Sequence, residues 1–389
     1  MDRLGQRWCA DRVMNWLHDD PKTTHAITKG KSHALTLKIA YGNVLVDLHT
    51  NLGRIIRQCR DYFGPNDDFG KRERTMWRME CEQDNMLQFH VTPRGSVQQI
   101  CLENEQDGYR WSVPKWQVLE VPCSRSLILV ATKWRRLRIV SRTQDALFYH
   151  TRKVIRHVIT SELVQAGAVM FHAACLERAG VGIAIAGARN TGKTTTLCAL
   201  LRSAGSAYVS NDKLLITSDS DSVHGIGWPT KVGVCIGTRL AVPELRPFVP
   251  SGSLCLDRMN PDNLWNNPKS RLFLPGDFAR AFCAQRRRST VIKYVVFPEL
   301  HSSGSRPCLR PLNSRDFTAR LQASVLGLHH SDDHFRYPVW LGLSSVSQAN
   351  LIKSSAACID RIVRSTTGFS LRGGGDVEAI QEAAKVLVA

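Results

Sequence analysis

Residues 181–195, VGIAIAGARNTGKTT, combine an apolar run with a glycine-bracketed loop and a lysine. The spacing Gly187-x4-Gly192-Lys193-Thr194 is typical of a loop that binds phosphate. Glycines let backbone N–H groups turn toward phosphate oxygens, and the helix that follows presents its positive N-terminal end to them. Lys193 would reach the β- and γ-phosphates, and the hydroxyl of Thr194 would ligate Mg²⁺. The motif therefore predicts a site for a nucleoside triphosphate.

The residues on either side of this motif support the interpretation and argue against a chance match. Val181, Ile183 and Ile185 belong to a run that predicts a buried strand. Residues 194–201 can continue as a helix behind the loop. A strand, a loop and a helix in this order form the context that a phosphate-binding loop needs.

Two further residues stand out by their positions at the ends of predicted strands. Residues 168–172, AVMFH, predict a strand that ends at His172, and residues 207–216 predict strand, turn and strand with Asp212 in the turn. Strands that flank the loop strand in sequence can neighbour it in space, which would bring both side chains to the phosphates. A structural interpretation exists for each, since Asn-Asp pairs form turns and a lone histidine can be a hydrogen-bonded core residue. Lys213 and Lys231 are candidates to contact phosphate or the acceptor, but we interpret each as a solvated surface lysine.

The whole arrangement, FHAAC…IAGARNTGKTTT…VSNDKLLI…GWP, resembles the HPr kinase/phosphorylase superfamily over roughly residues 150–345. That superfamily has shorter relatives encoded with ribosomally made peptides, and the ATP-dependent phosphoenolpyruvate carboxykinases share its nucleotide-binding core. The resemblance implies an α/β fold with a P-loop core. It also implies an ATP- and Mg²⁺-dependent phosphotransferase that acts on a hydroxyl, either of a peptide Ser/Thr or of a small metabolite.

The resemblance assigns roles to residues of this chain. Asp212 matches the general base that takes the proton of the acceptor hydroxyl, and His172 matches the histidine near the transferred phosphoryl group. Lys193 would neutralise charge on that group. Thr194 and Asn211 would ligate the metal. The nucleotide-binding set is Gly187, Ala188, Arg189, Asn190, Thr191, Gly192, Lys193, Thr194 and Thr195.

Departures from the family pattern leave alternatives open. Asn211 stands where the family has the first aspartate of a pair, and Thr195 stands where true HPr kinases have an acidic residue. The C-terminal signature of bifunctional HPr kinases is not recognisable, so a specialised kinase fits better than a phosphorylase. The first alternative is a nucleotide-binding regulatory protein without catalysis. The second is an ATPase stimulated by nucleic acid, for which Glu299 after VVFP is a poor acidic candidate.

The composition limits which partners and which cellular compartment we expect. The net charge of +18 favours an anionic acceptor, but its basic residues are dispersed and no nucleic-acid reading motif accompanies them, so nucleic acid is not the expected partner. The 12 cysteines are scattered, without metal-site spacing. No apolar stretch is long enough for a membrane span, and the N-terminal residues do not form a signal peptide. We therefore expect a cytoplasmic protein with reduced thiols and no membrane association.

The chain is expected to form two domains: an α+β accessory or substrate-docking domain over 1–150 and the kinase domain over 151–389. In the first, residues 33–41 and 44–48 predict a hairpin around Gly42-Asn43, and residues 52–63 predict an amphipathic helix. In the second, residues 217–226 and 248–270 are predicted as loops, the latter shaping the acceptor site. The basic run 286–288 is interpreted as a solvated helix end or loop. The family resemblance also raises a homo-oligomer as one expectation.

Overall fold

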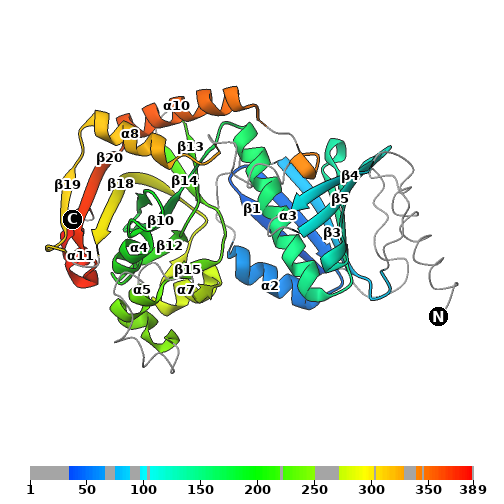
Figure 1. Cartoon of the computed structure of the whole chain (residues 1–389), viewed down its shortest axis with the longest axis horizontal. Coiled ribbons are helices and arrows are strands. Elements are labelled where there is room, and N and C mark those ends of the chain that lie inside the picture. The colour runs from blue at the N-terminus through cyan, green and yellow to red at the C-terminus, as the bar shows by residue number, and fades with distance from the viewer. Residues whose placement is uncertain are drawn as a thin grey trace. The chain divides into compact units, whose positions relative to one another are not determined.

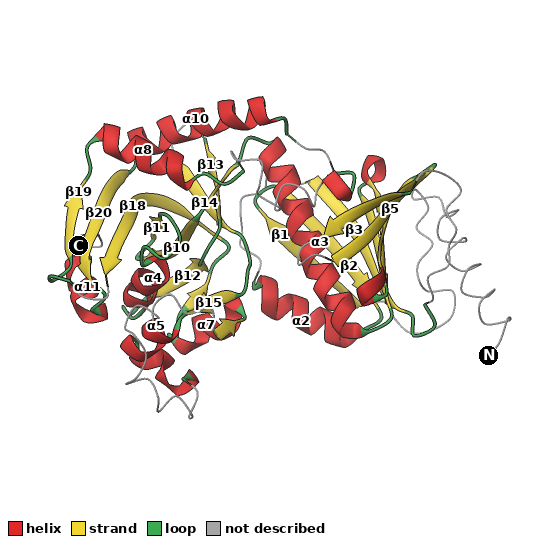
Figure 2. Cartoon of the chain, viewed as in Figure 1, coloured by secondary structure: helices red, strands yellow, loops and turns green. Residues whose placement is uncertain are grey.

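The computed structural model describes residues 35–65, 75–87, 97–102, 106–219, 222–249, 271–301, 304–327, 339–343 and 346–387. Over these residues the chain is a mixed α/β protein that divides into two compact units (Figures 1 and 2). The first unit takes the described residues within 35–60, 75–165 and 339–343, and the second takes the others. Residues 250–270 of the loop predicted at 248–270 lie outside the described part of the chain.

The first unit is built on a sheet whose described strands run in the order β1-β2-β3-β8-β7-β6-β5-β4. β1 and β2 form the predicted hairpin, with Tyr41 opposite Val44 across the Gly42-Asn43 turn. The predicted amphipathic helix is present as α2 and connects β2 to its parallel neighbour β3, as a parallel pair requires. The elements are β1 (Leu35–Tyr41), β2 (Val44–Thr50), α2 (Gly53–Phe63), β3 (Thr75–Gln83), β4 (Gln98–Leu102), β5 (Gln106–Val113), β6 (Trp116–Val121), η1 (Pro122–Ser124), β7 (Ser126–Ala131), η2 (Thr132–Trp134), β8 (Arg136–Ser141) and α3 (Gln144–Gln165).

The long helix α3 covers one face of this sheet and contacts β2, β3, β7 and β8 (Figure 1). The β3 side chains beneath it are buried, and two of them make polar contacts with the helix. The indole of Trp77 donates to Glu162 at 2.8 Å, and the Cys81 thiol lies 3.2 Å from the Thr151 hydroxyl. The division expected at residue 150 therefore falls inside a helix that belongs wholly to the first unit. Helical periodicity predicts such a helix but not which sheet it covers.

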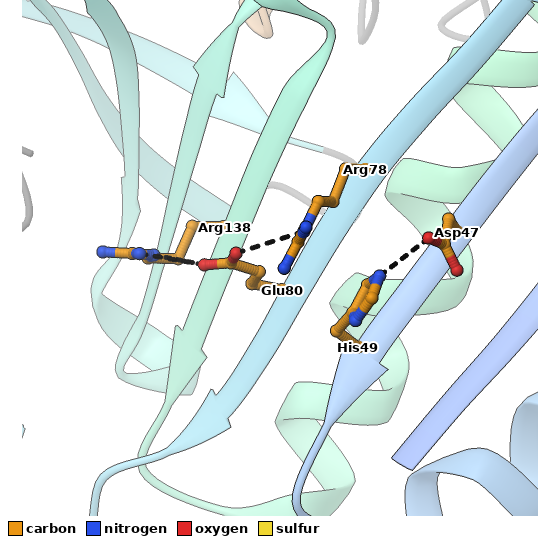
Figure 3. A network of polar contacts seen from close by, with 5 residues as sticks. All are labelled: Asp47, His49, Arg78, Glu80 and Arg138. Carbon is orange, nitrogen blue, oxygen red and sulfur yellow. Dashed lines mark hydrogen bonds and ion pairs between the residues drawn. The ribbon is translucent and has the colours of Figure 1, made fainter. Parts of the chain in front are cut away.

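The opposite face of the same sheet carries a network of charged side chains (Figure 3). Arg138 donates to one oxygen of Glu80 at 3.2 and 2.9 Å, and Arg78 lies 3.5 Å from the other oxygen. His49 and Asp47 contact each other at 2.8 Å on the neighbouring strand. A buried carboxylate is costly without partners, so the two guanidinium groups explain how Glu80 is accommodated in this face.

The second unit is built on a larger mixed sheet whose main path runs β17-β12-β10-β11-β18-β14-β13-β9 within the described residues. β18 is its longest strand and pairs with β11, β14 and β20 along different parts of its length. Its strands are β9 (Val169–Phe171), β10 (Ala173–Arg178), β11 (Val181–Ala186), β12 (Ser206–Ser210), β13 (Leu214–Ser218), β14 (Val223–Gly227), β15 (Val232–Val234), β16 (Arg271–Phe273), β17 (Gln285–Arg286), β18 (Ser289–His301), β19 (Cys308–Pro311) and β20 (Thr367–Gly374); β15 and β16 form a separate pair. Its helices are α4 (Lys193–Leu201), α5 (Ile236–Ala241), η3 (Pro243–Phe248), α7 (Pro275–Ala281), α8 (Ser314–Ser324), α10 (Gln348–Ser365), α11 (Val377–Ala383) and η5 (Lys385–Leu387).

Helices cover both faces of this sheet, which explains the continuous apolar run before the loop. Ile183 and Ile185 of β11 face the core beneath α4 and α11, whereas Ala184 and Ala186 face the core beneath α8 and α10. Figure 1 shows these two helix layers on opposite sides of the sheet. A strand buried on both faces reads as uninterrupted hydrophobic sequence rather than as an alternation.

Two local predictions differ from the structure. The loop expected over 217–226 is reduced to the tip of a hairpin, because β13 continues to Ser218 and β14 begins at Val223. The basic run 286–288 is not wholly solvated. Arg288 is buried and donates to the carbonyls of Phe63 at 3.1 Å and Gly64 at 2.6 Å, which lie at the C-terminal end of α2 and belong to the same unit as Arg288.

No helix within the described ranges is long and apolar enough to cross a membrane. The cysteines in these ranges are all free thiols.

Gly227 is required where β14 passes close to β12. A Cβ at this position would lie 2.3 Å from the carbonyl oxygen of Val209, which is backbone and cannot turn aside. We predict that Gly227→Ala lowers the free energy of unfolding by about 1–3 kcal/mol, measured by urea denaturation. Gly53→Ala is the control, because a Cβ there meets only side-chain atoms at 3.5 Å or more. Equal stability of the two variants would contradict the prediction.

Candidate functional site

The segment between β11 and α4 forms a tight loop whose shape depends on three special residues. Gly187, Asn190 and Gly192 have positive φ values of 146°, 66° and 100°. Glycine adopts such angles without steric cost, and asparagine is among the few other residues that accept the left-handed region. The residue types of the motif are therefore those that this backbone path requires.

The neighbouring strand β18 holds the loop in place. The backbone N–H of Leu300 donates to the carbonyl of Thr191 at 3.1 Å. A Cβ on Gly192 would lie 2.7 Å from the Leu300 side chain, so this position also needs glycine for space. The loop thus rests against the carboxyl end of a strand parallel to β11.

Helix α4 begins directly after the loop and points its N-terminus at it. The first backbone bond of the helix runs from Thr196 N–H to the Gly192 carbonyl at 2.9 Å. The N–H groups of Lys193, Thr194 and Thr195 precede this bond and have no acceptor within the helix. Together with the helix dipole they make the region suited to an anion.

Lys193 is buried and folds back over the loop. Its Nζ donates to the carbonyls of Gly187 at 2.9 Å and Ala188 at 2.6 Å. Burial lowers the pKa of this lysine to about 8, although the negative charge of Asp212 works in the opposite direction. The ammonium group is therefore held next to the loop and within electrostatic reach of Asp212.

His172 and Asp212 come from separate segments and contact each other. His172 lies at the corner between β9 and β10, where its backbone N–H donates to the Ser324 carbonyl at 2.8 Å. Its Nε2 is 3.1 Å from Oδ1 of Asp212, which follows β12. Burial acts to raise the pKa of Asp212, but the hydrogen bond to His172 and the charges of His172, Lys213 and Lys193 outweigh it and lower that pKa. Asp212 is therefore held as a carboxylate that can accept a proton.

Thr194 and Asn211 also meet, at the position where the sequence predicts a metal. The Thr194 hydroxyl lies 3.2 Å from Oδ1 of Asn211. Adjacent ligands of an octahedral Mg²⁺ with bonds near 2.1 Å are about 3 Å apart, so this oxygen pair fits two positions of one coordination sphere. No cluster of three or more His, Cys, Asp or Glu side chains suited to a metal occurs among the described residues. A metal here would need phosphate and water oxygens to complete its shell.

The remaining members of the predicted nucleotide-binding set lie around the loop, with one exception. Ala188, Arg189 and Asn190 are exposed at its tip. The Thr195 side chain is instead buried and contacts the hydroxyl of Thr238 in α5 at 2.9 Å. The Thr195 side chain therefore joins α4 to α5 rather than lining the loop.

Lys213 lies closer to the candidate site than the favoured sequence interpretation implies. It was interpreted as a solvated lysine, yet it is buried and its Nζ lies 4.6 Å from the centre of the buried Trp228 ring. Its charge also acts on Asp212. The available signal was its place directly after Asp212. Lys231, by contrast, is exposed as expected.

Glu299, the acidic candidate for an ATPase, is engaged in two ion pairs. It lies near the end of β18 and pairs with Arg320 of α8 and with Arg372 of β20, the latter at 2.7 Å. These pairs lower its pKa against the effect of burial. A carboxylate shared by two guanidinium groups is poorly placed to activate water.

Comparison with known proteins adds no assignment. No protein-family model matches the chain, and no curated protein does either. The functional argument therefore depends on the geometry of the site.

Asn190 offers a test of the loop conformation that does not depend on any ligand. We predict that Asn190→Gly leaves the free energy of unfolding within about 0.5 kcal/mol of the wild type, because glycine accepts φ of 66°. Asn190→Val is predicted to lower it by about 1–2 kcal/mol, because a β-branched residue is strained at positive φ. Thermal or urea unfolding of the two variants checks both values. Equal stability would mean that the loop does not need this conformation.

Proposed function

We propose that this protein is an ATP- and Mg²⁺-dependent kinase with an HPr-kinase-like P-loop core. It would transfer the γ-phosphoryl group to a hydroxyl of a peptide Ser/Thr or of a small hydroxylated metabolite. The contact of His172 with Asp212 beside the buried Lys193 carries this proposal. A loop suited to phosphate and a carboxylate placed as a base are the two parts that phosphoryl transfer to a hydroxyl requires.

The proposal gives each residue a role that its contacts support. Asp212 accepts the proton of the acceptor hydroxyl as that oxygen attacks the γ-phosphorus, while the bond between the γ-phosphorus and the β–γ bridging oxygen breaks and ADP leaves. His172 orients the carboxylate through the 3.1 Å contact, and Lys213 helps to keep it ionised. Lys193 exchanges its loop carbonyls for phosphate oxygens and neutralises their charge. The backbone N–H groups at the start of α4 hold the phosphates.

Thr194 and Asn211 would hold the magnesium ion. When bound with the nucleotide, the ion supplies positive charge to the β- and γ-phosphate oxygens. Both protein ligands are neutral oxygens, so the phosphates are needed to bind the ion well.

One observation favours a second candidate, a regulatory protein that binds a nucleotide without transferring phosphate. The neutral Asn211 stands beside Thr194 in place of a carboxylate, which weakens the hold on the metal. An ATPase that acts on nucleic acid is less well supported, because Glu299 is held by Arg320 and Arg372.

The first experiment is transfer of the label from γ-³²P-ATP with Mg²⁺ to a panel of hydroxylated peptides and metabolites. We expect the wild type to label an acceptor and Asp212→Asn to lower kcat about 10²- to 10⁴-fold, since a positioned base contributes that much. The dissociation constant for ATP should change less than tenfold. Asp360→Asn, on the exposed face of α10, is the matched control and should keep full activity.

The outcomes separate the two candidate functions. Tight ATP binding without label in any acceptor, unchanged by Asp212→Asn, would favour the regulatory protein. Label transfer that survives Asp212→Asn would refute Asp212 as the base.

The pKa of Lys193 predicts how nucleotide binding depends on pH. With a pKa of about 8 before ligand binds, this lysine loses its charge as the pH rises, and phosphate binding must then restore the proton. We expect the dissociation constant for ATP to rise above pH 8 by up to about tenfold per unit. Titrations between pH 7.5 and 9.5 test this. Lys193→Arg should give a flat profile, because a guanidinium stays charged. A flat profile for the wild type would contradict the assignment.

A further inference from the structure

A second group of cationic side chains lies beside the loop helix, around Arg239 of α5. Arg239 is only 3% exposed, although it carries a full charge. Its Nη1 donates to the carbonyl of Phe248 at 2.8 Å, and its Nε is buried without any hydrogen-bond acceptor. A buried guanidinium with an unused N–H is costly unless an acceptor completes it.

Arg271 of β16 is the neighbour of this group. It stands opposite Val234 in the β15–β16 pair and is exposed. Its guanidinium carbon lies 4.8 Å from the ring centre of Phe248 and 5.3 Å from that of Phe273. Stacking on aromatic rings fixes the plane of an arginine and leaves its N–H edge available to a ligand.

No carboxylate forms an ion pair with either arginine in the part of the chain that the structure describes. Burial and the like charge of Arg271 both lower the pKa of Arg239. Three other arginines, Arg78, Arg156 and Arg202, also keep a buried N–H without an acceptor. Arg78 and Arg202 are each paired with a glutamate, and Arg156 makes a further interaction. Arg239 and Arg271 have no such ion pair among the described residues.

The position of the pair links it to the candidate site. Thr238, the residue before Arg239, contacts Thr195 in the first turn of α4 at 2.9 Å. The chain reaches α5 from Trp228, which packs on Lys213, through residues 229–231 and β15. Arg239 is therefore on a segment anchored at both ends to residues around the loop.

We propose that Arg239 and Arg271 form a second anion-binding site, separate from the Gly187–Gly192 loop, that binds a phosphate or carboxylate group of the phosphoryl acceptor. The bound oxyanion would accept from the unused Nε of Arg239 and from Arg271, which satisfies the buried donor and separates the two like charges. The identity of the ligand as an acceptor rests on the proposed kinase function. The anion site itself does not.

Calorimetric titration with inorganic phosphate tests the site on the full chain. Lys193→Met serves as the background, so that phosphate binding at the loop is weakened. In this background we expect Arg271→Gln and Arg239→Gln each to weaken phosphate binding about tenfold or more, as expected for loss of a charge-assisted bond. Arg280→Gln, which removes one exposed charge from α7, is the control and should have no effect. Acetate in place of phosphate distinguishes a carboxylate from a phosphate preference.

Three results would overturn the proposal. These are phosphate binding that persists in both arginine variants, an equal loss in Arg280→Gln, or a loss of ATP binding when either arginine is changed with Lys193 intact. The last would assign the arginines to the nucleotide site. Arg239 is buried, so Arg239→Gln could misfold. If urea unfolding shows that Arg239→Gln is unstable, the result for the exposed Arg271→Gln decides the test.

Phosphoryl transfer supplies an independent measurement. With an acceptor that carries an anionic group, Arg271→Gln should raise the KM for the acceptor with little change in kcat, and an uncharged acceptor should show no such effect. If no acceptor is labelled by the wild type, the kinase proposal fails, and the phosphate titration still decides the anion site.

Discussion

The hydrogen bond from Leu300 N–H to the Thr191 carbonyl is the contact that determines the position of the loop. It ties the loop to β18, which is also the strand that joins β11, β14 and β20 into one sheet. Because β18 is parallel to β11, its carboxyl end emerges beside the loop and leaves room only for glycine at 192. The start of α4, and with it Lys193 and Thr194, depends on this one close approach.

The charges in the site are balanced locally rather than by the basic surplus of the chain. Asp212 has His172, Lys193 and Lys213 around it, and Lys193 is in turn stabilised by Asp212 and by two loop carbonyls. The net charge of +18 therefore says little about this site. It is more informative at Arg239 and Arg271, which form no ion pair with a carboxylate among the described residues.

Local features of the fold could be predicted from the sequence, because they depend on neighbours in the chain. The hairpin around Gly42-Asn43, the helix after it and the strand–loop–helix around Gly187 are of this kind. Features that depend on pairing between segments far apart in the sequence could not be predicted. Apolar runs such as VIKYVVF predict a core strand but not that it lies next to β11, and residue 150 could not be recognised as lying inside a helix that packs on the first sheet. The same limit explains Lys213 and Arg288, whose burial results from Trp228 and from the end of α2. His172 and Asp212 could be singled out because both follow predicted strands that flank the loop strand in sequence, and the structure places them 3.1 Å apart.

The two carbonyls that Lys193 contacts determine how much negative charge a ligand needs to bind at the loop. In this state the ammonium group is already satisfied by Gly187 and Ala188, so an incoming anion must compete with both oxygens. A singly charged group offers little more than the carbonyls it displaces. Several closely spaced negative oxygens offer far more, since they also meet the N–H groups at the start of α4. The resting position of one lysine therefore favours a group with several negative oxygens over chloride or a carboxylate.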